Sequence, residues 1–362
     1  MASNLIVQTA FLGDLLLSIP LMKKCRELWP EDDLVLVCRK GLGDFFLKTG
    51  LVDRVFEVQK GQRKTYVEAL QGLSQLTIRN LISPHQSVRT QLFCAQVKAA
   101  QKISFDNFIG RFIFRTVKKE DSLPDALRQL ALLKDLDVDL AHQISEYKRT
   151  EKPYQTNERH QLPGTPSWAS MSLRDSVLKD EKLWINLVSK FSLKGFSEKK
   201  VVLIFPGSVW ATKRWTEEGF IGAGRSLKNQ GYEVYVMGGP GEEELSERVA
   251  QSIGGVSSLA GKTKIFESAQ MIARASLVIG NDSASTHLAA VCETPLIAVF
   301  GPTVLEFGYR PWSDQSYVVE EKGMSCRPCG KHGHHKCPIG THACMKQISA
   351  ERVVAVAKTI LR

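Results

Sequence analysis

The stretch "SLVIGNDSASTHLAAVCETPLIAVFG", residues 276–301, decides the fold. Its two apolar runs, 276–279 and 295–301, flank a segment that starts with polar and hydroxyl residues and continues as "HLAAV". Strand–helix–strand alternation of this kind is typical of a parallel sheet with helices on its faces. The helix is expected to begin at Asp282 or Ser283. The polar residues there form either a helix cap or a binding site for an anion.

The same alternation occurs in two halves of the chain. Strands are expected at 4–8, 32–38, 53–58, 101–105, 199–205, 232–239, 276–281 and 295–301. The helices expected between and after them include 12–30, 65–73, 87–100, 178–191, 216–230, 242–253 and 349–362. The pattern weakens between about 146 and 200, where a polar, proline-containing stretch is interpreted as a surface excursion or linker. We therefore predict an α/β protein with two Rossmann-like domains.

Length and charge indicate the number of domains and the kind of molecule that the protein binds. The chain has 362 residues, which favours two domains over one. Its 48 Lys and Arg against 38 Asp and Glu give a net charge of +10, which suits nucleic acid, a phosphorylated small molecule or an anionic membrane. Basic residues are seldom interleaved with aromatic ones, which disfavours nucleic acid.

The amino-terminal sequence resembles a secretory signal only superficially. It lacks a basic first segment, and Gly13 and Asp14 interrupt its apolar run, so we expect no signal peptide. An uninterrupted apolar run of about 18 residues, which a spanning helix needs, is not found in the sequence. We expect a cytoplasmic protein with reduced thiols.

Two loops that follow predicted strands carry charged candidates. Ligands of open α/β sheets bind beyond the carboxyl ends of the strands. The loop "QTAFLGDLLLS" places Asp14 in the first turn of a helix, where it either complements the helix dipole or takes part in chemistry. The loop "PGSVWATKRW" carries Lys213 and Arg214, which either neutralise a diphosphate or lie in a solvated basic loop.

The third such loop is the polar start of the helix in 276–301. Backbone N–H groups of Ser283, Ala284 and Ser285 would point outward at the positive end of the helix dipole, as an anion site requires. A capped helix in which His287 packs against a neighbour is the alternative. All three loops lie at equivalent ends of strands, which favours one shared cleft.

Two nucleotide-binding motifs are absent. The first predicted strand is not followed by G-x-G-x-x-G, which disfavours a dinucleotide-dependent dehydrogenase. In "GVSSLAGKT" five residues separate Gly255 from Gly261, where a P-loop has four.

A cluster of cysteines and histidines near the carboxyl terminus suits a metal. The stretch "CRPCGKHGHHKCPIGTHAC" contains Cys326, Cys329, Cys337 and Cys344 together with four histidines. Four such ligands form tetrahedral zinc sites, although spacings of two, seven and six residues are shorter than in common zinc ribbons. A zinc site and a reduced, metal-free loop both remain open.

Several motifs resemble those of a known family. "FLGDLLLSIPLMKKCRELWP", "PGSVWATKRWTEEGF", "VMGGPGEEE", "LAGKT", "IGNDSASTHLAA" and "PLIAVFGPT" occur in the order seen in lipopolysaccharide heptosyltransferases, glycosyltransferase family 9. "SCRPCG" and "KCPIGTHACMKQI" resemble the tail of the heptosyltransferase II branch. The resemblance implies a GT-B fold, with an acceptor domain at 1–178, a nucleotide-sugar domain at 179–346 and a last helix, 347–362, that crosses back onto the first domain.

The resemblance also implies roles for individual residues. Asp14 resembles the family's general base and Lys213 its phosphate-binding lysine. The donor site would comprise Asp282, Ser283, Ala284, Ser285, His287 and, for the ribose hydroxyls, Glu242 or Glu243. The acceptor's anionic groups would be bound by Lys60, Arg63, Lys64 and Arg89.

The activity implied is an inverting, metal-independent transfer of a heptose from ADP-heptose to the anionic lipid A–keto-sugar acceptor of the lipopolysaccharide inner core. Such an enzyme would need no catalytic cofactor, would not bind nucleic acid, and would work as a peripheral protein at the inner face of the inner membrane. The alternatives are a nucleotide-sugar epimerase of the same fold, transfer of a different sugar to a cell-envelope glycan, and a basic nucleic-acid-binding protein.

Overall fold

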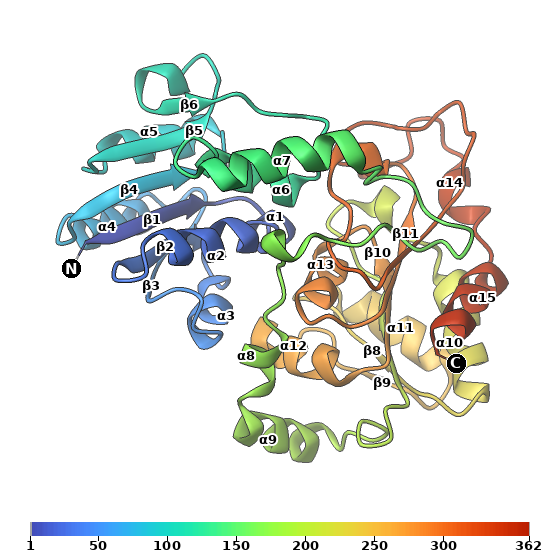
Figure 1. Ribbon diagram of the computed structural model, residues 1–362. Coiled ribbons are helices and arrows are strands. Elements are labelled where there is room, and N and C mark those ends of the chain that lie inside the picture. The colour runs from blue at the N-terminus through green and yellow to red at the C-terminus, as the bar shows by residue number, and fades with distance from the viewer. Residues whose placement is uncertain (1, 362) are drawn as a thin grey trace. The chain divides into compact units, whose positions relative to one another are not determined.

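The computed structural model describes residues 2–361 and contains two compact units. One comprises the chain up to Glu151 together with Pro166–Met171, and the other comprises Lys152–Thr165 together with the chain from Ser172 onward. Each unit has a six-stranded sheet in which all neighbouring strands are parallel (Figure 1). The predicted α/β class and the two parallel sheets are confirmed.

The first sheet has the strand order β3-β2-β1-β4-β5-β6. Its strands are β1 (Ser3–Gln8), β2 (Asp33–Arg39), β3 (Arg54–Val58), β4 (Ile78–Ser83), β5 (Gln101–Phe105) and β6 (Arg115–Val117). All six residues of β1 are buried, because helices cover a parallel sheet on both faces. The order reverses between β1 and β4, so the loops that follow these two strands diverge and leave room for a ligand.

The second sheet has the order β12-β11-β10-β7-β8-β9. Its strands are β7 (Val201–Phe205), β8 (Glu233–Val236), β9 (Ser257–Ser258), β10 (Leu277–Asn281), β11 (Leu296–Phe300) and β12 (Ser316–Glu320). Here the order reverses between β7 and β10. The loops after these two strands are the ones that carry Lys213 and Asp282.

Helices connect the strands of each sheet. In the first unit they are α1 (Leu12–Leu16), α2 (Ile19–Leu28), α3 (Gly43–Lys48), α4 (Arg63–Leu73), α5 (Val88–Gln96), α6 (Asp125–Leu130) and α7 (Val138–Thr150). In the second they are α8 (Arg174–Leu178), α9 (Glu181–Phe191), α10 (Glu217–Asn229), α11 (Glu243–Ile253), α12 (Ile265–Arg274), α13 (Ala284–Val291), α14 (Ala343–Lys346) and α15 (Ala350–Ile360). Thr216 and Ser349 cap α10 and α15, since their side chains accept hydrogen bonds from the Gly219 and Arg352 amides.

The single helix predicted at 12–30 is in fact two helices, α1 and α2. Pro20 lacks the amide hydrogen that would continue the first helix, and it occupies the first turn of the second, where that hydrogen is not needed. Ser18 lies at the junction. Its buried hydroxyl bonds to the Asp14 carbonyl at 3.1 Å and to Gln129 Oε1 at 2.5 Å.

Strand β4 was not predicted, because Arg79 and Asn80 interrupt its apolar run. Asn80 is nevertheless buried and donates to Asn4 Oδ1 at 2.7 Å. Asn4 in turn donates to the Asp32 carboxylate at 3.1 Å. A hydrogen-bonded chain of this kind offsets the cost of placing polar side chains inside the sheet.

The polar stretch 152–165 is part of the region interpreted above as a surface excursion or linker, and it packs on β12 at the edge of the second sheet. Leu162 N–H donates to the Ser316 carbonyl at 2.8 Å, and Val318 N–H donates to the His160 carbonyl at 2.8 Å. The guanidinium of Arg310, fully buried, donates to the carbonyls of Pro153 and Pro163. The unit boundary therefore differs from the predicted 178/179, because backbone hydrogen bonds hold this stretch on the second sheet.

The last helix, α15, packs on the second sheet. α15 belongs to the second unit, where Val353, Val354 and Val356 join the core that contains Trp215 and Phe220. It packs mainly against α10, with further contacts to β11 and β12. The resemblance implied that this helix returns to the first domain, and the contacts just described belong to the second unit. Its buried valines complete an apolar core of the second unit.

Candidate functional site

Asn281, the last residue of β10, holds two loops together at the carboxyl end of the second sheet. Its side chain is fully buried. The amide group donates to the carbonyls of Pro206 and Gly207 at 2.9 and 3.0 Å, and Oδ1 accepts from the Trp215 amide at 2.8 Å. Asn281 therefore fixes both ends of the loop 206–215. Sequence reasoning missed this role, because the partners lie 66–75 residues away.

Lys213 and Asp282 meet in this fixed loop arrangement. Lys213 Nζ lies 2.5 Å from Asp282 Oδ2, and the two side chains are 13% and 6% exposed. Thr303 Oγ1 donates to the same carboxylate oxygen at 2.7 Å. Two residues predicted separately thus form one ion pair, and Thr303 is a further partner that the sequence did not reveal. A lysine partly withdrawn from water interacts more strongly with an anion than one on an open surface.

Helix α13 begins beside this pair. Ser283 is its N-cap residue by backbone conformation, but its side chain makes no capping bond and instead lies 2.9 Å from the Ser285 hydroxyl. Thr286 Oγ1 donates to the carbonyls of Asn281 and Ser283. The helix was expected to begin at Asp282 or Ser283, and with Ser283 as its N-cap residue its first helical residue is Ala284. The amides of a helix's first turn and the two serine hydroxyls are the groups that bind phosphate oxygens in proteins.

His287 lies inside the unit, behind this helix start. It is 4% exposed, and within residues 2–361 its buried Nδ1 has no hydrogen-bond partner. Burial lowers the pKa of His287 to about 4, an effect that the neighbouring Asp282 carboxylate opposes and the Lys213 ammonium reinforces. The ring is therefore neutral at physiological pH.

Glu242 and Glu243 point to different loops. The Glu242 carboxylate accepts from the Gly239 amide at 2.8 Å and lies so close to Gly207 that a Cβ there would sit 2.1 Å from it. Burial raises the pKa of Glu242, while the Gly239 amide and the Arg214 charge oppose that rise. The Glu243 carboxylate bonds to the Gly241 amide at 2.7 Å, beside Gly261. Glu242 thus lies at the ends of β7 and β8, whereas Glu243 lies against another loop.

In the first unit, Asp14 lies in the first turn of α1, directly after the end of β1, and is half-buried. Its carbonyl accepts from Ser18 and from Gln129, which holds the turn in place. The same end of the sheet contains Arg39, whose guanidinium donates to the Thr9 carbonyl at 2.9 Å. His85 lies 2.9 Å from the Thr9 hydroxyl, and burial lowers its pKa to about 4.

Arg39 and His85 are polar residues near Asp14 that sequence reasoning did not select. His85 follows β4, and without that strand nothing in the sequence placed the histidine at the end of the sheet. The signal that would have found it is the switch in strand order at β1 and β4.

Two of the four basic residues predicted for the acceptor come together. Arg63 at the start of α4 and Arg89 at the start of α5 line one groove of about 670 Å³. Lys60 and Lys64 are exposed nearby in sequence, and Lys64 lies 3.8 Å from Glu68. The groove is otherwise mainly apolar.

The cysteine- and histidine-rich loop packs on the segment that carries Lys213, the short 3₁₀ turn η4 (Ala211–Lys213). The Thr212 hydroxyl bonds to the carbonyl and the amide of His334 at 2.9 and 2.7 Å. His342 Nε2 lies 2.9 Å from the Thr212 carbonyl. These hydrogen bonds between the loop and Thr212 fix the turn that carries Lys213.

The same contacts leave the thiols dispersed among other partners. Cys344 packs in the core, Cys337 accepts a backbone hydrogen bond from His342, and Cys329 bonds to the Cys326 carbonyl. Within residues 2–361, no three His, Cys, Asp or Glu side chains converge as a metal-binding group. In the described residues, the zinc site considered above at Cys326, Cys329, Cys337 and Cys344 thus lacks a ligand set.

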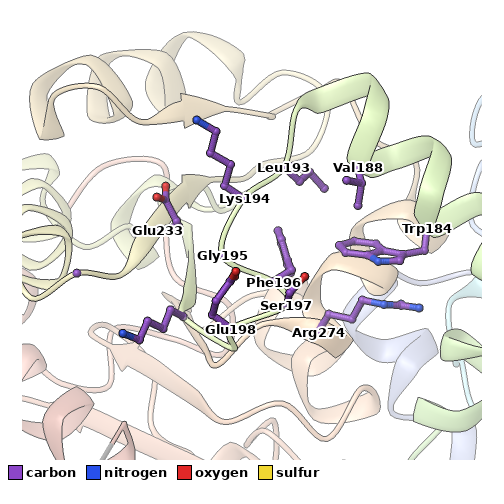
Figure 2. Close-up of a pocket in the computed structure, with 12 residues that line it drawn as sticks. Trp184, Val188, Leu193, Lys194, Gly195, Phe196, Ser197, Glu198, Glu233 and Arg274 are labelled. Atoms are coloured by element: carbon purple, nitrogen blue, oxygen red, sulfur yellow. The ribbon is translucent and has the colours of Figure 1, made fainter.

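A separate cavity of about 700 Å³ lies at the opposite, amino-terminal end of the second sheet (Figure 2). Lys200 and Glu233, which border β7 and β8, line it together with Trp184, Phe196 and Arg274. The Arg274 guanidinium lies 4.5 Å from the centre of the Trp184 ring. Since ligands of such sheets bind at the carboxyl ends, this cavity is not the candidate site.

Between residues 2 and 361, the structure contains no helix with the length and hydrophobicity needed to span a bilayer.

Comparison with known proteins identifies relatives of this chain. Lipooligosaccharide heptosyltransferase 2 of Campylobacter jejuni is 28% identical over 292 residues, which are 73% of this chain and 90% of that protein. The structure of E. coli ADP-heptose LPS heptosyltransferase II superposes with a TM-score of 0.75 at 18% identity, covering 100% of this chain and 98% of the other. E. coli heptosyltransferase WaaC with ADP gives 0.70 at 17% identity, with 99% of each chain covered. At such identities the structural likeness establishes the fold, GT-B.

The family itself is established by sequence. Residues 80–338, more than half of the chain, match glycosyltransferase family 9 (heptosyltransferase). The matched region includes Lys213, Glu242 and Asp282, while Asp14 precedes it. The chain therefore belongs to glycosyltransferase family 9, the heptosyltransferases, and is a glycosyltransferase of GT-B fold.

Proposed function

We propose that the enzyme transfers a heptose from ADP-heptose to a lipid A–keto-sugar acceptor of the lipopolysaccharide inner core. The observation that carries this proposal is the buried Lys213–Asp282 pair beside the first turn of α13. A cation, a carboxylate and helix amides at the switch point of a parallel sheet suit a sugar diphosphate.

We assign each residue of the donor site a role in binding ADP-heptose. Lys213 and the start of α13, with Ser283, Ala284 and Ser285, bind the diphosphate and stabilise the charge that develops when ADP departs. Asp282 binds hydroxyl groups of the sugar and orients Lys213. Glu242 accepts hydrogen bonds from the ribose hydroxyls, and His287 supports the helix as a neutral ring.

Asp14 is the general base of the proposal. Its carboxylate takes the proton from the acceptor hydroxyl, the hydroxyl oxygen bonds to the anomeric carbon, and the bond from that carbon to the phosphate oxygen breaks. A single displacement of this kind inverts the anomeric configuration. Lysine and amides supply the charge stabilisation, so we propose that turnover needs no metal ion.

The acceptor is anionic, and Lys60, Arg63, Lys64 and Arg89 are the residues proposed to bind its phosphates and carboxylate. The proposed location is the cytoplasm, at the inner face of the inner membrane. Nucleic acid is not a proposed partner.

The test is to incubate the protein with ADP-heptose and a lipid A–keto-sugar acceptor in the presence of a chelator and to measure ADP release. Acceptor-dependent ADP release and an inverted anomeric centre in the product, read by NMR, are expected. Asp14→Asn should reduce turnover by roughly 10²-fold or more without preventing ADP binding. Unchanged turnover in this variant would refute the base assignment.

The alternatives predict different readouts. An epimerase would convert the nucleotide-sugar without an acceptor. Transfer of a different sugar would appear as a preference for another donor when ADP-linked and UDP-linked sugars compete. A nucleic-acid-binding protein would bind duplex or single-stranded DNA with a steep dependence on salt.

A further inference from the structure

Exposed apolar side chains are concentrated on one part of the first unit. Eleven large apolar side chains are exposed within the described residues, and five of them lie on α4, on α5 and in the loop after β5. These five, called the apolar surface below, are Val67, Val88, Leu92, Phe108 and Phe112. Such a concentration on a soluble domain marks an interaction site, whereas isolated exposed side chains do not.

The two phenylalanines protrude furthest. Phe108 and Phe112 are 82% and 83% exposed, and their rings contact each other edge to face with centroids 6.2 Å apart. Phe108 precedes the short 3₁₀ turn η1 (Gly110–Phe112), and Phe112 is its last residue. Aromatic side chains held in water by a short turn lose the hydrophobic stabilisation that burial would give them.

The groove between α4 and α5 extends the apolar surface. Val67 and Leu70 of α4 and Val88 and Leu92 of α5 line it, and the exposed fractions of Val88 and Leu92 are both 55%. The loop that leads into α5 also touches the start of the phenylalanine loop, because the Gln86 amide donates to the carbonyls of Phe105 and Asp106 at 3.2 and 3.3 Å. The segment that leads into α5 and the segment that carries the phenylalanines thus both follow the carboxyl ends of neighbouring strands, β4 and β5.

Cations border the apolar surface. Arg63 and Arg89 line the groove, and Lys118 is exposed beyond β6, next to β5 in the sheet. Two carboxylates nearby are paired, Glu68 with Lys64 and Asp106 with Arg111. Exposed aromatic and aliphatic side chains beside uncancelled positive charge match the interface of an anionic bilayer, where rings enter the headgroup region and cations bind phosphates.

We propose that this apolar surface docks the enzyme on an anionic lipid bilayer, with Phe108 and Phe112 inserted between headgroups. Arg63 and Arg89, proposed above to bind the acceptor's phosphates, bind phosphates of the bilayer when no acceptor is present. The proposal deepens the peripheral location proposed above by naming the surface, and it does not depend on which sugar is transferred. The occupant is a lipid bilayer. A second copy of the chain or another protein are competing outcomes of the test.

The experiment is flotation of the full chain with vesicles of phosphatidylcholine alone and with vesicles containing phosphatidylglycerol. Binding to the anionic vesicles, not displaced by soluble glycerol phosphate, is expected. Phe108→Ser/Phe112→Ser should weaken partitioning at least ~10-fold, because two large apolar side chains no longer insert. Arg63→Gln and Arg89→Gln should each weaken it roughly 5-fold and reduce its dependence on salt.

Matched controls lie elsewhere on the chain. Val138 and Ile185 are 72% and 64% exposed, and Lys358 is exposed on α15. Val138→Ser, Ile185→Ser and Lys358→Gln should leave vesicle binding unchanged. Folding of every variant is checked by its thermal transition with and without ADP.

Three results would overturn the proposal: no binding of the wild-type chain to anionic vesicles, equal loss in the controls, or full binding by Phe108→Ser/Phe112→Ser. Dimerisation of the wild-type chain that is abolished by the same pair, without vesicle binding, would assign the surface to a second copy. Vesicle binding is measured without donor or acceptor, so its failure is distinct from failure of the proposed transferase activity.

Discussion

Lys213 and Asp282, 69 residues apart in sequence, form a nearly buried ion pair at the switch point of the second sheet. Thr303 provides the carboxylate with a second hydrogen bond. Removing one partner of such a pair leaves a buried charge without compensation, and this costs more than the intact pair contributes. Comparing a variant that removes one charge with a variant that removes both therefore separates the effect on stability from the effect on turnover.

Lys213→Met keeps most of the side-chain stem and removes the charge. We expect turnover to fall roughly 10²- to 10³-fold, as on loss of one electrostatic stabiliser of a leaving group. The free energy of unfolding should fall by on the order of 3 kcal/mol, because Asp282 loses its counter-charge. Coupled ADP-release kinetics and urea titration measure the two effects.

The double variant Lys213→Met/Asp282→Asn supplies the control. It removes both charges, so most of the lost stability should return while turnover stays low. If turnover returned together with stability, Lys213 would have only a structural role.

Asn281→Asp tests how the loop 206–215 is held. Aspartate retains an acceptor for the Trp215 amide but replaces the donor to the Pro206 and Gly207 carbonyls by a carboxylate oxygen. We expect the free energy of unfolding to fall by about 2 kcal/mol and the affinity for ADP to weaken, because the loop that carries Lys213 is no longer fixed. Differential scanning calorimetry and ADP titration check both.

The matched control is Asn229→Asp at the exposed end of α10. It should change neither quantity. An Asn281→Asp protein with wild-type stability and ADP affinity would contradict the positioning role.

The elements that sequence analysis predicted best are those with a local signal. The core strands β1, β2, β7, β10 and β11 each contain a continuous apolar run of three or more residues, and Thr216 caps its helix through a partner three residues away. Strand β4 has no such run, because Asn80 is satisfied by Asn4 across the sheet. Such a contact is visible only in three dimensions.

The candidate site likewise has parts that the sequence predicted and parts that it did not. Position after a strand was enough to select Lys213 and Asp282, but nothing in the sequence indicates that they pair, or that Thr303 joins them. For α15, neither the sequence pattern nor the family resemblance indicates which core its apolar side chains join. Its valines have the spacing of an amphipathic helix, yet only the packed core determines which unit they complete.

Glu242 and Glu243 are adjacent in sequence, and only one lies at the ends of β7 and β8. Glu242→Gln removes the charge proposed to bind the ribose hydroxyls, so the affinity for ADP should fall ~10-fold. Glu243→Gln should change it less than about twofold, since its carboxylate bonds to Gly241. Isothermal titration with ADP compares the two. A larger loss of ADP affinity in Glu243→Gln than in Glu242→Gln would assign the ribose to Glu243. Equal losses in the two variants would contradict both assignments.

His287 makes stability depend on pH. Its pKa is about 4 in the folded protein and near 6.5 when unfolded, so the unfolded chain binds more protons between these values. The contribution of His287 to the free energy of unfolding is therefore fully present above about pH 6.5. It is lost as the pH falls towards 4, and the total loss is about 3 kcal/mol. His287→Leu removes this titration.

The measurement is urea unfolding of both proteins at about pH 7 and about pH 4.5, followed by hydrogen exchange of peptides from β10 and α13. The loss of stability on acidification should be about 2–3 kcal/mol smaller in His287→Leu than in the wild type. His85, whose pKa is also lowered to about 4 but in the first unit, is the control, since His85→Leu should leave exchange in β10 and α13 as sensitive to acid as before. An acid response that is the same with and without the His287 ring would show that the folded protein accepts a proton there at no cost.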